Sequence, residues 1–275
     1  MDERERGGLP AGLGELFADG GVGRSLAVDL PPGDFLWPDP GDALRSIDRP
    51  AFWMSDEPAS AGLWSALRAE HGRSGLWPVL LDESVQPWSA GHLVPDVPGE
   101  IDNYKPAQFM AEVWEDWCAQ ADPDQVAEEL APFGVECPGL APPGRPMAPP
   151  EQVADWYAGV LAERGMPLGL AAVHRGADAM AVMGWQGALH HNEWTPPLAA
   201  VVRSWEERFG ARVVAMGFNT LELSVAAPPA THEHALHVAA EHWAFCPDSI
   251  IQGPGDLHGY AEQIAGVNAW SFWWD

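Results

Sequence analysis

The sequence predicts an α+β protein of two packed halves, of which the C-terminal half is ferredoxin-like. Three observations predict this class. The chain has 275 residues with 47% apolar content, enough for one large domain or two of ordinary size. Residues 134–150 hold six prolines and three glycines, which excludes a helix or a central strand and indicates a linker or a covering loop. Beyond this segment, the periodic stretches follow a β-α-β-β-α-β order.

Residues 1–133 are predicted to form an N-terminal α/β half. The amphipathic stretch "PAQFMAEVWEDWCAQ" is typical of a helix with one apolar face, and Asp122-Pro123 is a cap for a further helix. Pro78 places its own strand near a sheet edge or a bulge, since proline cannot donate to a ladder. In chain order, the expected elements are a helix over 9–21, strands over 25–30 and 51–55, a helix over 59–72, a strand over 75–82, and helices over 106–120 and 122–131.

Residues 151–275 are predicted to form the C-terminal domain. Its first helix ends at Gly165, and Thr231 caps the long helix that follows the central strand pair. In the ferredoxin-like arrangement the last strand pairs beside the first, with an extra helix placed before it. The expected elements are helices over 150–165, 196–210, 231–245 and 256–266, and strands over 169–175, 212–217, 220–226 and 269–275.

The chain closes on "AWSFWWD", an aromatic segment for which strand alternation gives two faces. Trp270, Phe272 and Trp274 fall on one face and are expected to pack under the helices. Trp273 falls on the other face and needs its own cover, for which the N-terminal half is the natural candidate. The segment is therefore predicted to be a structural lid, with an oligomeric contact through this strand as the alternative.

The 40 acidic and 14 basic residues give a formal charge of −26, which repels nucleic acid and anionic lipid and attracts cations and basic proteins. The same charge could serve solubility alone. No signal-peptide pattern and no apolar stretch of membrane-spanning length occurs, and the three cysteines have no metal-ligand spacing. We therefore expect a cytoplasmic protein with no membrane or nucleic-acid partner.

Acidic residues are concentrated between residues 112 and 129, and no basic residue occurs from Pro106 to Gly144. Two solvated helix faces would explain this pattern. The sharper hypothesis is a docking surface for a basic protein, because opposite charges accelerate encounter. The expected partner-binding residues are Glu112, Glu115, Asp116, Glu128 and Glu129.

Catalytic motifs are weak or missing. Glu233, His237 and Glu241 recur every fourth residue on one helix and could hold a divalent cation, with His190-His191 as further ligands, although a solvated helix face is the simpler explanation. Cys246 lies at a helix C-terminus, where the helix dipole and Asp248 should raise its pKa, so it is expected to be a buried small residue. Phosphate-loop, dinucleotide and serine-nucleophile motifs are absent, and no cofactor is expected.

The stretches "MGWQG", "RSWEERFGARVVAMGFNTLELSVAAPPAT", "AAEHWAFCPDSIIQG" and "WSFWWD" resemble an actinobacterial family without assigned function, domain-of-unknown-function family 4253. The resemblance covers mainly residues 183–275 and implies no activity. Acidic, Trp-rich families of this style look like immunity proteins of toxin systems. The motif positions, which serve either function or packing, are Trp185, Asn192, Trp205, Glu241, Asp248, Trp273 and Asp275.

The leading hypothesis is thus a non-catalytic binding protein that holds a basic protein partner, such as a toxin, on an acidic, Trp-anchored surface. The alternative is a metal-assisted hydrolase built around Glu233, His237 and Glu241. The sequence leaves the oligomeric state open.

Overall fold

The structure is a computed structural model that describes residues 24–38, 49–90, 93–188 and 194–275. It has a mixed α+β fold, as predicted, with one seven-stranded sheet and ten α-helices among the described residues. The helix expected over 9–21 lies outside the described residues.

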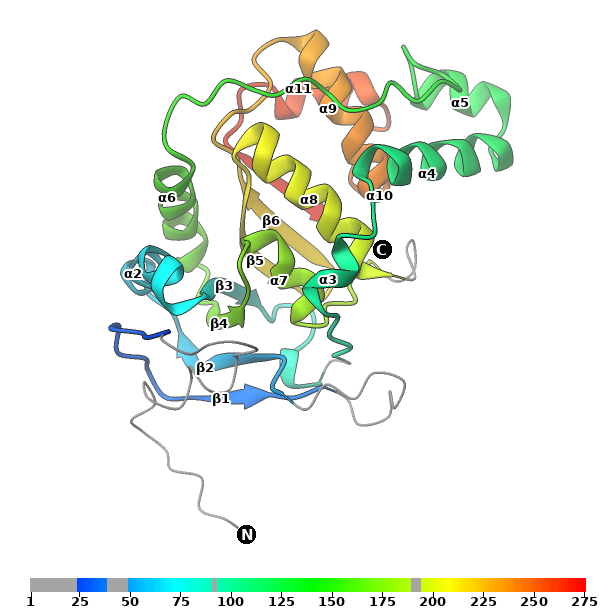
Figure 1. The fold of residues 1–275 in the computed structure, drawn as a ribbon. Coiled ribbons are helices and arrows are strands. Elements are labelled where there is room, and N and C mark those ends of the chain that lie inside the picture. Colours follow the sequence, from blue (N-terminus) through cyan, green and yellow to red (C-terminus); the bar gives the residue numbers. More distant parts are fainter. Residues whose placement is uncertain (1–23, 39–48, 91–92, 189–193) are drawn as a thin grey trace.

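The sheet has the strand order β1-β2-β4-β3-β5-β6-β7 (Figure 1). Every neighbouring pair is antiparallel except β3 and β5, which run parallel. The central strands β3, β4 and β5 are almost continuously apolar because both of their faces are covered. The strands are β1 Gly33–Leu36, β2 Phe52–Pro58, β3 Leu76–Asp82, β4 Pro167–Ala172, β5 Arg212–Gly217, β6 Thr220–Ser224 and β7 Ala269–Trp273.

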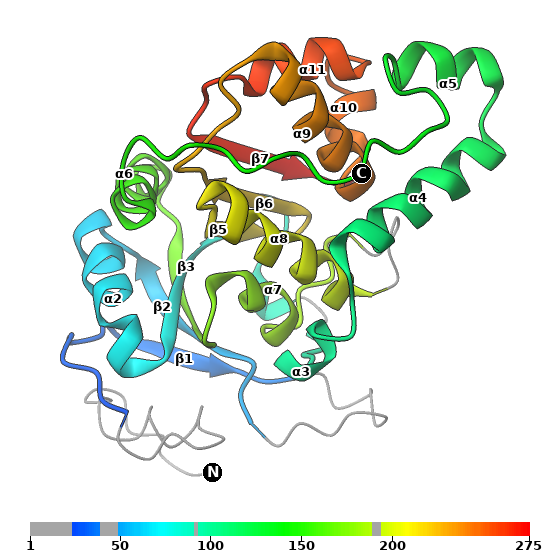
Figure 2. The same ribbon diagram turned by 45° about the horizontal axis from the view of Figure 1, so that its top comes forward.

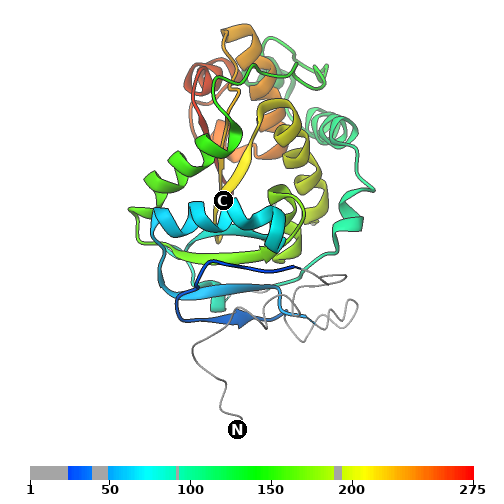
Figure 3. The ribbon, with the colours of Figure 1, turned by 60° about the vertical axis from the view of Figure 1, so that its left-hand side comes forward.

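Helices cover both faces of the sheet (Figures 1 and 3). On one face, α2 packs on β3 and on α6, and α6 reaches β5 and β6. On the other face, α8 and α9 cover the apolar side chains of β6 and β7. The helices are α2 Ala61–Ser74, α3 Pro98–Ile101, α4 Pro106–Gln120, α5 Pro123–Glu129, α6 Pro150–Ala162, α7 Ala179–Val182, α8 Thr195–Phe209, α9 His232–Phe245, α10 Asp248–Ile251 and α11 Leu257–Ile264, with short 3₁₀ turns at Trp88–Ala90 and Gly176–Asp178.

The strand expected over 25–30 is wrong. This segment alternates as a strand would, and Leu26, Val28 and Leu30 pack against the core. However, its backbone joins no ladder with the described residues, and residues 33–36 pair with β2 instead. Alternating burial of side chains therefore does not require strand pairing here.

Pro78 does not mark an edge, since β3 lies inside the sheet between β4 and β5. Its pairing with β5 begins only at Leu80, so the missing amide hydrogen of Pro78 falls where β5 is not yet a partner. The indole nitrogen of Trp77 donates there to the Val213 carbonyl at 2.9 Å, linking the two strands through a side chain.

The ferredoxin-like arrangement is not confirmed. In that topology the last strand would lie beside β4, whereas β7 pairs with β6 at the edge of the sheet. A strand from before the proline-rich segment, β3, occupies the place between β4 and β5 and pairs with both. The parts on either side of 134–150 thus share one sheet, and their division into separate domains stays a prediction.

Residues 134–150 run across the body between α5 and α6 (Figure 2). Gly144 donates its amide to the Arg208 carbonyl at 3.0 Å, and Met147 donates to the Ala226 carbonyl at 3.3 Å. A side chain at Gly144 would collide with the Ala227 carbonyl oxygen, so only glycine permits this close approach. The segment is a covering loop fastened to the C-terminal part.

The alternation expected for the last strand is confirmed. Trp270, Phe272 and Trp274 are buried, and Phe272 stacks on Trp205 of α8 with ring centroids 5.5 Å apart. Trp273 is half-buried on the opposite face. Cys246 and Ser249 hydrogen-bond to its backbone, and the expected cover of its side chain by the N-terminal half stays a prediction.

Candidate functional site

Helices α4 and α5, residues 106–129, form a projection that we call the acidic arm (Figures 1 and 2). Four of the five carboxylates predicted to bind a partner are exposed on it, namely Glu112, Glu115, Asp116 and Glu128, whereas Glu129 is half-buried. Glu112 accepts a hydrogen bond from Gln108 at 2.8 Å, and Glu129 accepts one from Gln125 at 2.9 Å. The two helices therefore bring the predicted residues onto one projecting unit.

Tryptophans attach the acidic arm to the body. Trp114 and Trp117 meet Trp243 of α9 edge-on, with ring centroids 5.2 and 4.9 Å apart, and the Trp114 indole donates to the Gly134 carbonyl. Trp114 is buried and Trp117 half-buried against the body, so these two indoles support the arm and are not exposed beside its carboxylates. The tryptophans that are exposed, Trp37 and Trp156, lie on other parts of the chain.

The three side chains proposed to hold a metal ion, on α9, lie in different surroundings. Glu233 is exposed, and His237 hydrogen-bonds through Nδ1 to the Glu233 carbonyl of its own helix. Glu241 is buried and bonded to Arg208. No group of three or more His, Cys, Asp or Glu side chains in the described part of the chain could hold a metal ion. His190 and His191 lie outside the described residues.

Glu241 is the centre of a buried polar network. Its carboxylate accepts two hydrogen bonds from the Arg208 guanidinium, one from the Trp205 indole at 2.8 Å and one from the Ala141 amide at 2.6 Å. These partners join α8, α9 and the covering loop. A buried carboxylate with four donors is satisfied, so Glu241 and Trp205 have a structural role in this geometry.

The remaining motif positions also make packing contacts. The Trp185 indole donates to the Gly217 carbonyl at 2.8 Å, and its ring lies edge-on to Trp274. Asp248 accepts the Asp275 amide at 3.0 Å and thereby holds the last residue of the chain. Asn192 lies outside the described residues.

Cys246 is fully buried, and burial raises the pKa of its thiol to about 12, with Asp248 contributing in the same direction. This agrees with the expectation of an inert, buried cysteine. Burial, more than the charge of the neighbouring carboxylate, is the main cause of the shift.

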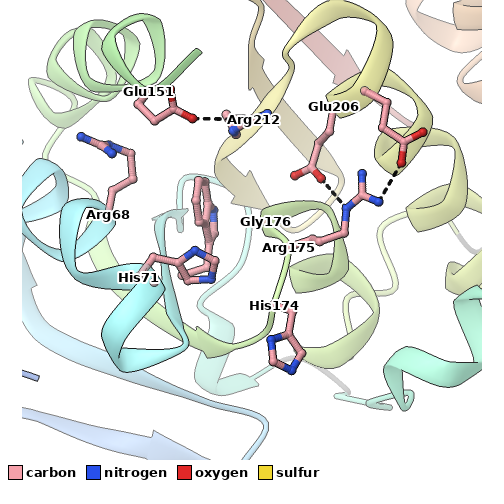
Figure 4. A pocket seen from close by; sticks show the side chains of 11 residues that line it. Arg68, His71, Glu151, His174, Arg175, Gly176, Glu206 and Arg212 are labelled. Carbon is pink, nitrogen blue, oxygen red and sulfur yellow. Dashed lines mark hydrogen bonds and ion pairs between the residues drawn. The ribbon is translucent and has the colours of Figure 1, made fainter. Parts of the chain in front are cut away.

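A polar pocket of about 330 Å³ was missed from the sequence (Figure 4). Its lining includes three arginines, Arg68, Arg175 and Arg212, which come from α2, the segment after β4, and β5. His71 and His174 also line it. Because these residues come from distant segments, they form no linear motif, and no pattern in the sequence predicts the pocket.

Two walls of this pocket are held by ion pairs. Asp155 of α6 binds Arg68 through both carboxylate oxygens at 2.6 and 2.7 Å. Glu206 binds Arg175 at 2.8 Å and also accepts the Ala177 amide. Burial raises the pKa of Glu206, while Arg175 opposes the shift. Burial likewise lowers the pKa of His71, whose Nε2 hydrogen-bonds to the Val173 carbonyl.

Within the described residues, the structure has no helix with the length and apolar character required to cross a membrane. Comparison of the chain with curated proteins and with solved structures gave no match in either set. Strands β4 to β7 and the helices between them lie in the part of the chain that matches a known protein family. Residues 167–275 match the family described as Domain of unknown function (DUF4253).

Proposed function

We propose that this chain is a non-catalytic binding protein that holds a basic protein partner on the acidic arm. One observation carries the proposal. The exposed carboxylates of the arm, among them Glu112, Glu115, Asp116 and Glu128, form no ion pair with any described basic side chain. Some exposed acids elsewhere, such as Asp102 and Glu207, are paired with arginines. The arm thus offers negative charge that a partner could neutralise.

The attachment of the arm favours binding without reorganisation. Trp114 and Trp117 pack on Trp243, and the Trp114 indole is hydrogen-bonded, so the carboxylates stand on a fixed support. A surface that is ordered before binding loses less conformational entropy in the complex. Affinity would then come from complementary charge on a rigid support, without exposed aromatic anchors.

The net charge of the whole chain indicates the chemistry of the partner. With a formal charge of −26, the protein repels nucleic acid and anionic membranes and speeds encounter with basic proteins. A basic toxin that the protein neutralises, as an immunity protein does, fits this description. We also propose a cytoplasmic location, which suits the three free cysteines.

The test uses matched charge variants. The first carries Glu112→Gln, Glu115→Gln and Asp116→Asn. The control removes three exposed carboxylates elsewhere, at Asp56, Glu57 and Glu262, so both variants have the same net charge. A partner captured from the host lysate at low salt is purified, and its affinity for the wild type and both variants is measured across a salt series.

The proposal predicts that the arm variant weakens binding and flattens its salt dependence, whereas the control keeps most of both. Equal loss in both variants would assign the effect to net charge alone. Unchanged binding in the arm variant would place the docking surface elsewhere on the molecule.

A further inference from the structure

The polar pocket between α2, α6, α8 and β5 has unused hydrogen-bond donors. We propose that it binds a small molecule carrying an oxyanion, a carboxylate or a phosphate, through Arg68 and Arg212. This site is separate from the acidic arm, because the arm contributes no residue to its lining. The volume of about 330 Å³ lies at the lower end of the range for small-molecule sites.

Arg68 is fixed and yet has free donors. Asp155 engages its Nε and Nη2 atoms, which leaves both hydrogens of Nη1 without a partner among the described residues. The side chain is 15% exposed, and it lines the pocket. A guanidinium held in this way is pre-organised for an incoming anion, because its orientation is set before binding.

Arg212 is the second donor, and its present partner can be displaced. Its Nη1 donates to the Ala211 carbonyl, and its Nη2 reaches Glu151 at 3.2 Å. The Glu151 side chain is 49% exposed, so this ion pair contributes little and a ligand oxyanion can replace it. In the view of Figure 4, Arg212 lies between Arg68 and Arg175.

The residues on the opposite wall indicate which kind of molecule carries the oxyanion. Arg175 is engaged at each of its three nitrogens, which donate to Glu206, Glu207 and the Arg203 carbonyl. Three arginines and three glutamates line the pocket, so its formal charge is balanced. This balance favours an oxyanion carried on a polar organic body, so succinate should bind more tightly than inorganic phosphate.

His174 supplies a further group at the rim. Its side chain is exposed, lines the pocket and forms no hydrogen bond with the described residues. Arginine is the preferred residue for planar, two-point recognition of carboxylate and phosphate, and an imidazole N–H beside it can donate a further hydrogen bond.

The experiment measures binding of inorganic phosphate and of succinate to the full chain by calorimetry at low ionic strength. The two probes distinguish phosphate from carboxylate recognition. The proposal predicts saturable binding of at least one probe. Arg212→Gln should weaken it about tenfold or more, as expected when a charged hydrogen-bond donor is lost. Glu151→Gln should strengthen it, because it removes the competing carboxylate.

Arg73→Gln is the matched control, since Arg73 lies on the same helix as Arg68 but pairs with Glu70 outside the pocket. It changes net charge as Arg212→Gln does and should leave affinity nearly unchanged. Arg68→Gln can disturb packing because it loses the ion pair with Asp155, so the fold of this variant is checked by circular dichroism. The Arg212→Gln and Glu151→Gln variants decide the test. The proposal is overturned if neither probe binds the wild type or Glu151→Gln, or if Arg73→Gln weakens binding as much as Arg212→Gln.

Discussion

Arg208 and Glu241 form a two-point salt bridge inside the protein, with Nη1–Oε1 at 2.7 Å and Nη2–Oε2 at 2.6 Å. The Glu241 side chain is 1% exposed and that of Arg208 is 14% exposed, so the carboxylate is shielded from water and the guanidinium is largely shielded. The pair joins α8 to α9, and both members bond to Ala141 of the covering loop. It is therefore the point at which three segments of the chain are held together.

Glu241→Gln should lower the free energy of unfolding by about 3–5 kcal/mol, because it leaves the Arg208 guanidinium buried without its counter-charge. Urea unfolding followed by tryptophan fluorescence measures the change. Glu70→Gln, which breaks the more exposed pair with Arg73, is the control and should cost less than about 1 kcal/mol. Equal effects in the two variants would contradict the role assigned to this pair.

His242 should make the protein less stable in acid. Burial lowers its pKa well below the ordinary value, so the folded state keeps the imidazole neutral while the unfolded chain takes up a proton near pH 6.5. The stability that it contributes is complete above about pH 6.5 and is lost as the pH falls towards the lowered pKa of the folded state.

Between pH 7.5 and 5.5 the wild type should therefore lose more unfolding free energy than His242→Gln, which cannot titrate, by an amount on the order of 1 kcal/mol. Urea unfolding at the two pH values gives the difference, in which any baseline loss from the substitution cancels. His258→Gln removes an exposed imidazole as the control. Identical pH differences for wild type and His242→Gln would show that another group governs acid stability.

Local signals were sufficient for the longer helices but not for the single-turn helices α3, α7 and α10. The apolar face of 106–120 predicted α4 with the bounds that the structure has, and Thr231 caps α9 by accepting the His234 amide at 3.2 Å, as expected. In both cases the determining interactions lie within a few residues of each other. The exposure of Glu112, Glu115 and Asp116 followed from the same helical periodicity.

Long-range pairing was not predictable in this way. The place of β3 between β4 and β5 depends on contacts with strands about 90 and 135 residues further along the chain, which no periodicity encodes. The polar pocket depends on the same topology, because β3 carries Trp77 and β5 carries Arg212 into it. The misplaced strand at 25–30 shows the opposite error, in which Leu26 and Val28 alternate correctly but pair with no strand in the described part of the chain.

Phe272 and Trp273 are neighbours on opposite faces of β7 and should respond differently to truncation. Phe272 is fully buried against Trp205 and Phe245, so Phe272→Ala should cost about 3–5 kcal/mol. Trp273 is half-buried and loses fewer contacts, so Trp273→Ala should cost clearly less. Chemical denaturation of both variants measures the two costs, and a larger cost at Trp273 would place the strand in the wrong register.

The cysteines should differ in reactivity. Cys246 is buried and its pKa is raised to about 12, so almost none of it is thiolate at neutral pH. Cys118 and Cys137 are only partly buried. Iodoacetamide at pH 8 should therefore modify Cys118 and Cys137 in the folded protein and Cys246 only after urea unfolding, as peptide mass mapping would show. Rapid modification of Cys246 in the native state would mean that α10 opens readily.

Two side chains bind backbone groups at the outer edge of β7. Ser249 Oγ accepts the Trp273 amide at 3.2 Å, and Cys246 Sγ approaches the Trp273 carbonyl at 3.0 Å, so these outward backbone groups are not offered to another strand. Ser249→Ala should lower stability by about 1 kcal/mol and speed hydrogen exchange at the Trp273 amide. The Trp274 amide, which bonds to the Asn219 carbonyl at 3.0 Å, is the internal control. If size-exclusion chromatography shows association only in Ser249→Ala, then the bonded edge of β7 keeps chains apart. Unchanged hydrogen exchange at the Trp273 amide would show that Ser249 does not protect the edge.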